Sequence, residues 1–252
     1  MVTTNKVKQL IATYDRNCYL NGSLLVSYKG EVIINQGFGH ANIEHNTLNT
    51  NKTKYRIGSL TKAFTAYAIF QLQDKKKINI NDSINKYLIN HPHGDEITIY
   101  HCLTNTSGIP NYTASQDFWS NRMRLPLTLS ELIASFKDLP LNFKPGTKYE
   151  YSNSGYSILT AIIEMVSGRT YEKYMREEIF IPLGMHNTGC DNGRTIIPNM
   201  ASGYSIWEDI IHAEYTDMSH PLGGYGLYST TEDLLKWDQI LKTINFSDEG
   251  LI

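Results

Sequence analysis

A long apolar segment between residues 60 and 72 constrains the fold of this chain more than any other feature. Its many apolar residues are typical of a buried helix. They are Leu60, Ala63, Phe64, Ala66, Tyr67, Ala68, Ile69, Phe70 and Leu72. Ser59 and Lys62 stand at the start of this helix and share one face of it. An amine beside a hydroxyl at this place indicates a serine nucleophile, which needs a neighbouring base.

The pattern of a serine followed three residues later by a lysine is short, and the chain carries a second copy at Ser83 and Lys86. That copy lies in a polar segment with no apolar helix after it, so we interpret it as surface. For Lys62 the alternative interpretation is a lysine of the first helical turn whose charge reaches water. The context favours Ser59 and Lys62 as the functional pair.

Tyr151-Ser152-Asn153 is a second candidate element, because it follows a Pro-Gly turn and precedes a predicted helix. A phenol can accept or donate a proton where a nearby ammonium group lowers its pKa. An asparagine amide can donate to a substrate carbonyl. Tyr19 and Asn21 have the same spacing, so this short pattern is weak by itself.

Local patterns predict further elements on both sides of the apolar segment. We expect an amphipathic helix over residues 4–16 and a hairpin of two strands, Gly22–Tyr28 and Val32–Gly39, whereas residues 78–100 are expected to be loop-like. Further helices are predicted from Thr128 to about Asp138, from Asn153 to Ser167, from Tyr171 to Phe180 and from Asp233 to Leu241. Capping boxes at Thr128 and Ser229 begin the first and last of these, and Gly168 ends the second.

The composition argues against several classes of function. The chain has 252 residues and a net charge of −2, with no basic stripe that would indicate nucleic-acid binding. No segment has the length and apolarity of a signal peptide or a membrane span, so we expect a cytoplasmic location unless a leader has been removed. Cys18, Cys102 and Cys190 predict neither disulfides nor zinc. His91-Pro92-His93 is more typical of a polar loop than of a metal site.

Five longer stretches resemble the class C β-lactamase family of serine hydrolases, which includes penicillin-binding carboxypeptidases, D-aminopeptidases and esterases. The stretches are Tyr55–Lys62, His101–Pro110, Phe143–Tyr156, Ile181–Met185 and Gly223–Trp237. They follow the order of the family and together extend over about residues 20 to 240. This resemblance is far more specific than either short pattern.

The resemblance implies a role for each candidate residue. Ser59 is the nucleophile that becomes acylated, and its backbone N–H forms half of the oxyanion hole. Lys62 and Tyr151 share the proton transfers, and which of them is the base stays open. Asn153 binds the acyl-side amide of a small-molecule or peptide substrate. No metal or other cofactor is implied, because a serine acyl-enzyme needs none.

The implied reaction is acyl transfer to water from a β-lactam, a D-amino-acid peptide or a small ester. Two alternatives remain beside this hydrolase. The first is a penicillin-recognising sensor or binding protein that is acylated at Ser59 without turnover. The second is an inactive scaffold for protein interactions, against which the presence of all four site residues argues.

The resemblance also implies an α/β (α+β) fold, with a mostly antiparallel sheet flanked by helices and an inserted helical lobe. We expect one domain, with a sheet lobe over 1–59, a helical lobe over 60–225 and a return towards the sheet lobe over 226–252. The third motif of the family, His/Lys-Thr/Ser-Gly, has no counterpart after Trp237. We therefore expect a C-terminally incomplete chain that lacks one oxyanion donor and is a poor catalyst unless the missing part is supplied.

Overall fold

Eight helices and nine short strands make up the part of the chain that the computed structural model describes, residues 2–17 and 19–243. The helices are α1 (Val2–Arg16), α2 (Thr61–Asp74), α3 (Ile99–Leu103), α4 (Leu129–Ala134), α5 (Asn153–Ser167), α6 (Tyr171–Met175), α7 (Leu222–Tyr225) and α8 (Thr231–Leu241). The strands are β1 (Gly22–Tyr28), β2 (Glu31–Phe38), β3 (His40–Asn42), β4 (Thr47–Leu48), β5 (Tyr55–Arg56), β6 (Gly189–Cys190), β7 (Tyr204–Trp207), β8 (Asp209–His212) and β9 (Leu227–Ser229). Short 3-10 helices lie at Gly58–Leu60, Ile84–Lys86 and Tyr112–Ala114, and π-helical turns at Phe118–Arg122 and Arg176–Phe180.

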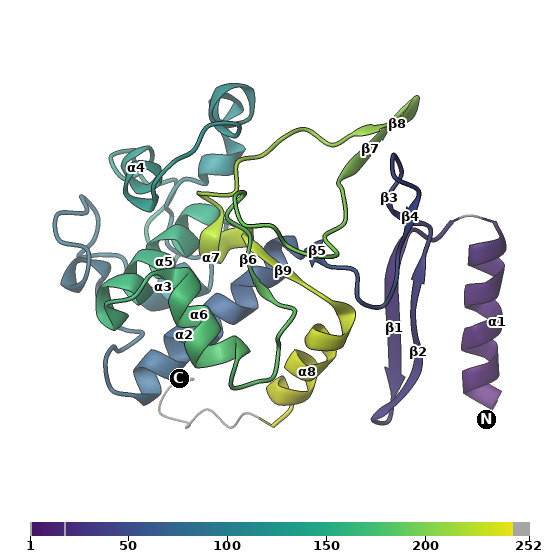
Figure 1. The fold of residues 1–252 in the computed structure, drawn as a ribbon. Helices are drawn as coiled ribbons and strands as arrows, with labels where there is room; N and C mark the ends of the chain where they lie inside the picture. The colour runs from purple at the N-terminus through teal and green to yellow at the C-terminus, as the bar shows by residue number, and fades with distance from the viewer. Residues whose placement is uncertain (1, 18, 244–252) are drawn as a thin grey trace.

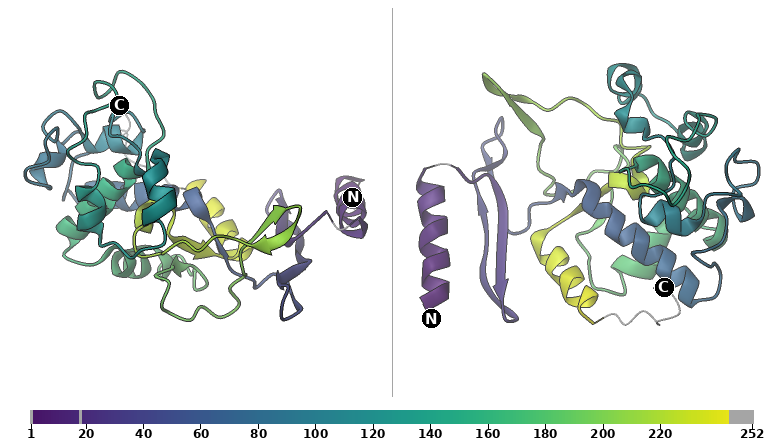
Figure 2. Two further views of the ribbon diagram at one scale, coloured as in Figure 1. Left: turned by 90° about the horizontal axis from the view of Figure 1, so that it is seen from above. Right: turned by 180° about the vertical axis from the view of Figure 1, so that it is seen from behind.

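All of the named strands pair in the antiparallel sense. β1 and β2 form the predicted hairpin, β5, β9 and β6 form a three-stranded sheet with β9 in the middle, and β3–β4 and β7–β8 form separate pairs. Figures 1 and 2 show α1 beside the hairpin at one end of the molecule and the helices α2 to α7 gathered at the other. α8 contacts β1 and so lies between the two parts.

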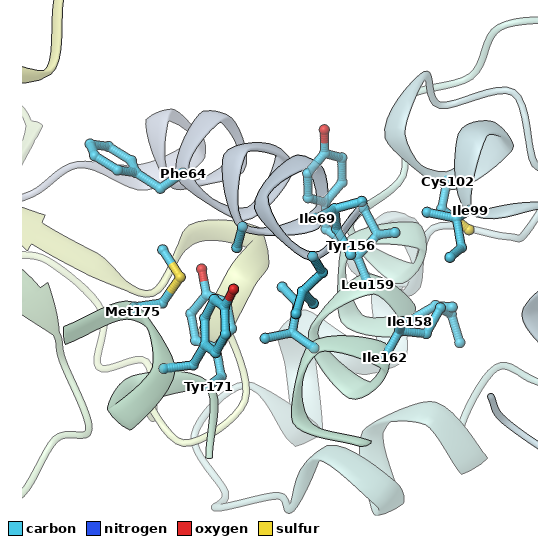
Figure 3. Close-up of a cluster of buried hydrophobic side chains, with 14 of the residues drawn as sticks. Phe64, Ile69, Ile99, Cys102, Tyr156, Ile158, Leu159, Ile162, Tyr171 and Met175 are labelled. Atoms are coloured by element: carbon cyan, nitrogen blue, oxygen red, sulfur yellow. The ribbon is translucent and has the colours of Figure 1, made fainter. Parts of the chain in front are cut away.

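The main core lies where α2 and α5 pack against each other (Figure 3). Phe64 and Ile69 from α2 and Ile158 and Leu159 from α5 are fully buried. Each such side chain contributes roughly 1.5–3 kcal/mol by leaving water. Trp237 stacks on Phe64 with ring centroids 4.2 Å apart, which ties α8 to the same core.

The predicted buried helix is confirmed as α2, although its first turn differs from the prediction. Leu60 is 58% exposed, and Ala63 is also exposed. Thr61, Lys62 and Thr65 are buried in their place. This end of α2 packs against α7. Polar side chains suit this contact, because they can form hydrogen bonds with backbone groups there and apolar side chains cannot.

Several helix ends follow the sequence signals. α5 begins and ends as predicted, with the Ser152 hydroxyl accepting from the N–H of Gly155 and with Gly168 at φ +66°. α4 has the predicted capping box between Thr128 and Glu131, but it ends at Ala134, earlier than predicted. The helix predicted up to Phe180 is α6 followed by a π-helical turn.

The capping box predicted at Ser229 is wrong by one residue. Thr230 caps α8, because its hydroxyl accepts from the N–H of Asp233. Ser229 belongs to β9, and its buried hydroxyl is hydrogen-bonded to that of Thr188. Glu232 accepts from the amides of Asn35 and Asn51, so it ties the start of α8 to β2 and to the segment before β5.

Cys102 and Cys190 are buried free thiols, whereas Cys18 lies outside the described residues. Residues 244–252, the last part of the segment predicted to return towards the sheet lobe, also lie outside the described residues. Burial raises the pKa of the Cys102 thiol to about 12, so it is protonated at neutral pH.

No helix in the part of the chain that is described has the length and apolarity to cross a membrane. The proposed division into lobes stays a prediction.

Candidate active site

Ser59 lies in the 3-10 turn directly before α2, with an exposed side chain. Gly58 precedes it at φ +52°, a left-handed conformation that glycine adopts without steric cost. The serine hydroxyl therefore lies at the surface, where a ligand can reach it.

Lys62 lies one turn into the helical segment and is only 7% exposed. Its Nζ is 2.6 Å from Asn153 Oδ1, 2.7 Å from the carbonyl oxygen of Gly224 and 3.3 Å from Ser59 Oγ. The two shorter contacts are with atoms that can only accept hydrogen bonds. They fix the orientation of the amine, so that its remaining hydrogen or lone pair is directed towards Ser59 Oγ.

Burial lowers the pKa of Lys62 to about 8, because the charged form loses hydration. The amine therefore exists in both protonation states near neutral pH. Its Nζ also lies 4.7 Å from the ring centroid of Tyr151 and 5.2 Å from that of Tyr156. These aromatic faces stabilise the ammonium form when it is present.

Tyr151 is 39% exposed and stands in the loop before α5. Its hydroxyl lies 2.5 Å from Ser59 Oγ, nearer than Lys62 Nζ does. Tyr151 and Lys62 therefore approach the serine hydroxyl from different elements. The structure thus brings together all four residues that the sequence analysis singled out: Ser59, Lys62, Tyr151 and Asn153.

Asn153 is the first residue of α5, and both ends of its side-chain amide are engaged. Oδ1 accepts from Lys62, and Nδ2 donates to Thr113 Oγ1 at 2.8 Å. Thr113 in turn bonds Asn111 Oδ1 at 3.0 Å, and this oxygen also accepts the backbone N–H of Asn153. Asn111 and Thr113 were not predicted from the sequence, although they directly follow the stretch that ends at Pro110.

α7 supplies two backbone carbonyls to the base of the site. Gly224 O accepts from Lys62, and Gly223 O accepts from Thr65 Oγ1 at 2.8 Å. A short helix of four residues thus presents both of these oxygens. Close packing requires a glycine at position 223, because a Cβ there would lie 2.4 Å from Thr160 Oγ1 and 2.9 Å from Thr65 Oγ1.

Gly223→Ala is expected to lower the free energy of unfolding by about 1–3 kcal/mol, because the added methyl group overpacks a buried contact. The displaced α7 would also loosen the carbonyl that holds Lys62. Gly224→Ala is the matched control, because the nearest atom to its added Cβ is 3.7 Å away. Urea denaturation of both variants checks this, and equal stabilities would contradict it.

The second serine–lysine pair is at the surface, as predicted. Lys86 is exposed and forms an ion pair with Asp82 at 2.9 Å. Within the described residues, no three His, Cys, Asp or Glu side chains are grouped so as to hold a metal ion.

The chain is similar to known proteins over most of its length. A model of the family described as Beta-lactamase matches residues 7–250. The putative penicillin-binding protein PbpX of Bacillus subtilis is 32% identical over 249 residues, which are 95% of this chain and 61% of that protein. The chain spans less than two thirds of the curated relatives it matches, 61% and 44% for the first two.

Solved structures show the same fold. A penicillin-binding protein from Bacillus halodurans superposes with a TM-score of 0.80 at 29% identity, over 92% of this chain and 72% of that one. A D-stereospecific amidohydrolase from Streptomyces sp. gives a TM-score of 0.68 at 28% identity, over 75% of this chain and 61% of that one. The predicted fold class, antiparallel sheet with flanking helices, is confirmed.

Proposed function

Because this chain belongs to the beta-lactamase family, we propose that it is a serine hydrolase that forms an acyl-enzyme at Ser59. The observation that carries the proposal is the convergence of a buried amine and a phenol on one exposed hydroxyl. A serine needs a base within reach to become a nucleophile, and this serine has two candidates.

In the first step, Ser59 Oγ attacks the carbonyl carbon of the substrate and Lys62, as the free amine, accepts the proton. Asn153 Oδ1 and Gly224 O hold the two hydrogens of that amine, which leaves its lone pair for the serine. The negative charge that develops on the substrate oxygen is stabilised by the N–H of Ser59. A pKa of about 8 suits this base, because it lies near working pH.

In the second step, the carbonyl re-forms and the bond to the leaving group breaks. The Tyr151 hydroxyl gives its proton to the leaving nitrogen or oxygen, and the ammonium of Lys62 replaces that proton. Water then attacks the acyl-enzyme by the reverse route, and Ser59 recovers its proton as the acid product leaves. All protons are thus accounted for within Lys62, Tyr151, the serine and one water molecule.

The substrate class we propose is an acyl compound with an exposed amide or ester bond: a β-lactam, a D-amino-acid peptide or amide, or a small ester. The likeness to a penicillin-binding protein and to a D-stereospecific amidohydrolase supports the first two. One acyl-enzyme mechanism serves all three, because each places a carbonyl carbon within reach of the serine.

Intact-mass spectrometry after incubation with a penicillin, a D-alanyl peptide and a p-nitrophenyl ester tests this proposal. A transient adduct that maps to Ser59, together with steady release of hydrolysed product, is the expected result. A stoichiometric adduct that persists without product would instead identify a sensor or binding protein. A folded chain that forms no adduct with any of the three reagents would refute the proposal.

The rate of acylation is expected to rise by about tenfold per pH unit below pH 8 and to level off above it. The sign follows from the role of Lys62, because the free amine becomes more abundant as pH rises through its pKa of about 8. Rapid-mixing measurement of the p-nitrophenol burst across pH 6–10 checks this. A burst rate that falls through pH 8 would show that the ammonium is the active form and Tyr151 the base.

A further inference from the structure

A hollow opens among the helices, and none of the four site residues lines it. It lies between residues 87–91, α4 and the second half of α5, and its volume is about 610 Å³. Small-molecule sites commonly fall between roughly 300 and 1,000 Å³. Much of its wall is apolar, formed by Leu129, Ile133, Ala134, Ala161 and Met165.

His91 lies in the wall of this hollow and is only 6% exposed. Neither of its ring nitrogens has a hydrogen-bond partner in the part of the chain that is described. Buried polar groups without partners are rare in native proteins, because they lose their bonds to water. The imidazole therefore offers one donor and one acceptor that the protein itself leaves unused.

The groups around His91 favour its neutral form, and Lys137 gives the hollow a positive charge without an ion-pair partner in the described chain. Burial lowers the pKa of His91, and the positive charges of His93 and Lys137 lower it further, while Asp138 opposes them. Lys137 also lines the hollow, is half-buried and has no ion-pair partner among the described residues. Glu164, the acidic residue in the wall, accepts the backbone N–H of Tyr171 at 2.7 Å.

We propose that this hollow binds an organic anion with an apolar body, whose carboxylate accepts hydrogen bonds from Lys137 and from a ring N–H of His91. The apolar body lies along α4 and α5, against Ile133 and Ala161. Ile89 and Met165, which are 81% and 63% exposed, lie at the rim and close over it. Because the ring nitrogens are closed off from solvent, binding includes a small shift of the exposed residues 89–90.

Isothermal titration calorimetry of the whole chain with sodium decanoate and with decan-1-ol, both below their aggregation limits, tests this proposal. We expect one decanoate to bind per chain, and decan-1-ol to bind at least about tenfold more weakly, because it lacks the charge. Lys137→Met should weaken decanoate binding by about tenfold, while the exposed control Lys52→Met should leave it unchanged. Equal affinities of the Lys137→Met variant and the parent chain would overturn the proposal.

The Ser59→Ala variant separates this hollow from the proposed active site, because decanoate binding should persist in it. Loss of binding in that variant would place the anion at Ser59 and overturn the assignment. A second readout is the ¹⁵N shifts of the His91 ring, assigned with His91→Gln, which should move on addition of decanoate. Unchanged His91 shifts at saturating decanoate would also overturn it.

Discussion

Alanine in place of Ser59 is expected to abolish every covalent adduct and to lower turnover by about 10,000-fold or more, because no other group can take its place as the nucleophile. The loss should appear in the rate constant and not in substrate binding, since Asn153 and the Ser59 N–H remain. Intact-mass spectrometry and steady-state kinetics on a p-nitrophenyl ester measure the two effects.

Ser83→Ala is the matched control for this substitution, because Ser83 heads the second serine–lysine pair on the surface. It should leave labelling and turnover unchanged. A Ser59→Ala chain that is still labelled at full rate would refute the proposed nucleophile. Labelling lost equally in both variants would point to a general effect on folding, which circular dichroism would detect.

Replacing Lys62 with methionine is expected to slow acylation of Ser59 by about 100- to 10,000-fold, the usual contribution of a positioned base. Methionine fills a similar volume but cannot accept the serine proton, and it leaves Asn153 Oδ1 and Gly224 O without a donor. The rise of the burst rate towards pH 8 should disappear at the same time, because the titrating amine is gone.

Lys86→Met provides the comparison for Lys62→Met, since it removes one lysine of the same pattern at an exposed position. Its burst rate and pH profile should match those of the parent chain. A Lys62→Met chain that keeps its rate at high pH would assign the base to Tyr151, which lies 2.5 Å from the serine oxygen. Stopped-flow kinetics at pH 7 and pH 9.5 distinguishes the two results.

The sequence predicted those features that depend on neighbouring residues. α5 was predicted to the residue, because Gly168 carries a local capping signal and Ser152 caps the helix while its hydroxyl donates to the carbonyl oxygen of Ile109. The cap of α8 was misplaced by one residue, because Ser229 belongs to β9 and its hydroxyl is bonded to Thr188. The local pattern thus failed where strand pairing, which depends on distant residues, took up the residue that was expected to cap.

The site was predictable in its side chains and not in its backbone. Ser59, Lys62, Tyr151 and Asn153 lie within the stretches that resemble the family, and the structure brings them together. The carbonyl of Gly224 could not be predicted, because every residue has a carbonyl and only the fold decides which one meets Lys62. The support of Asn153 by Thr113 likewise depends on a contact between residues 40 apart.

The hydrogen bonds of Lys62 join residues that are 91 and 162 positions apart in the chain. During synthesis, the amine therefore has no acceptor at Gly224 until almost all of the described chain has left the ribosome. Bringing such distant segments together is entropically costly and slow compared with forming the local turns of α2. The Lys62 amine should thus be among the last groups of the described chain to become ordered, so the reactivity proposed for the site would arise only late in folding.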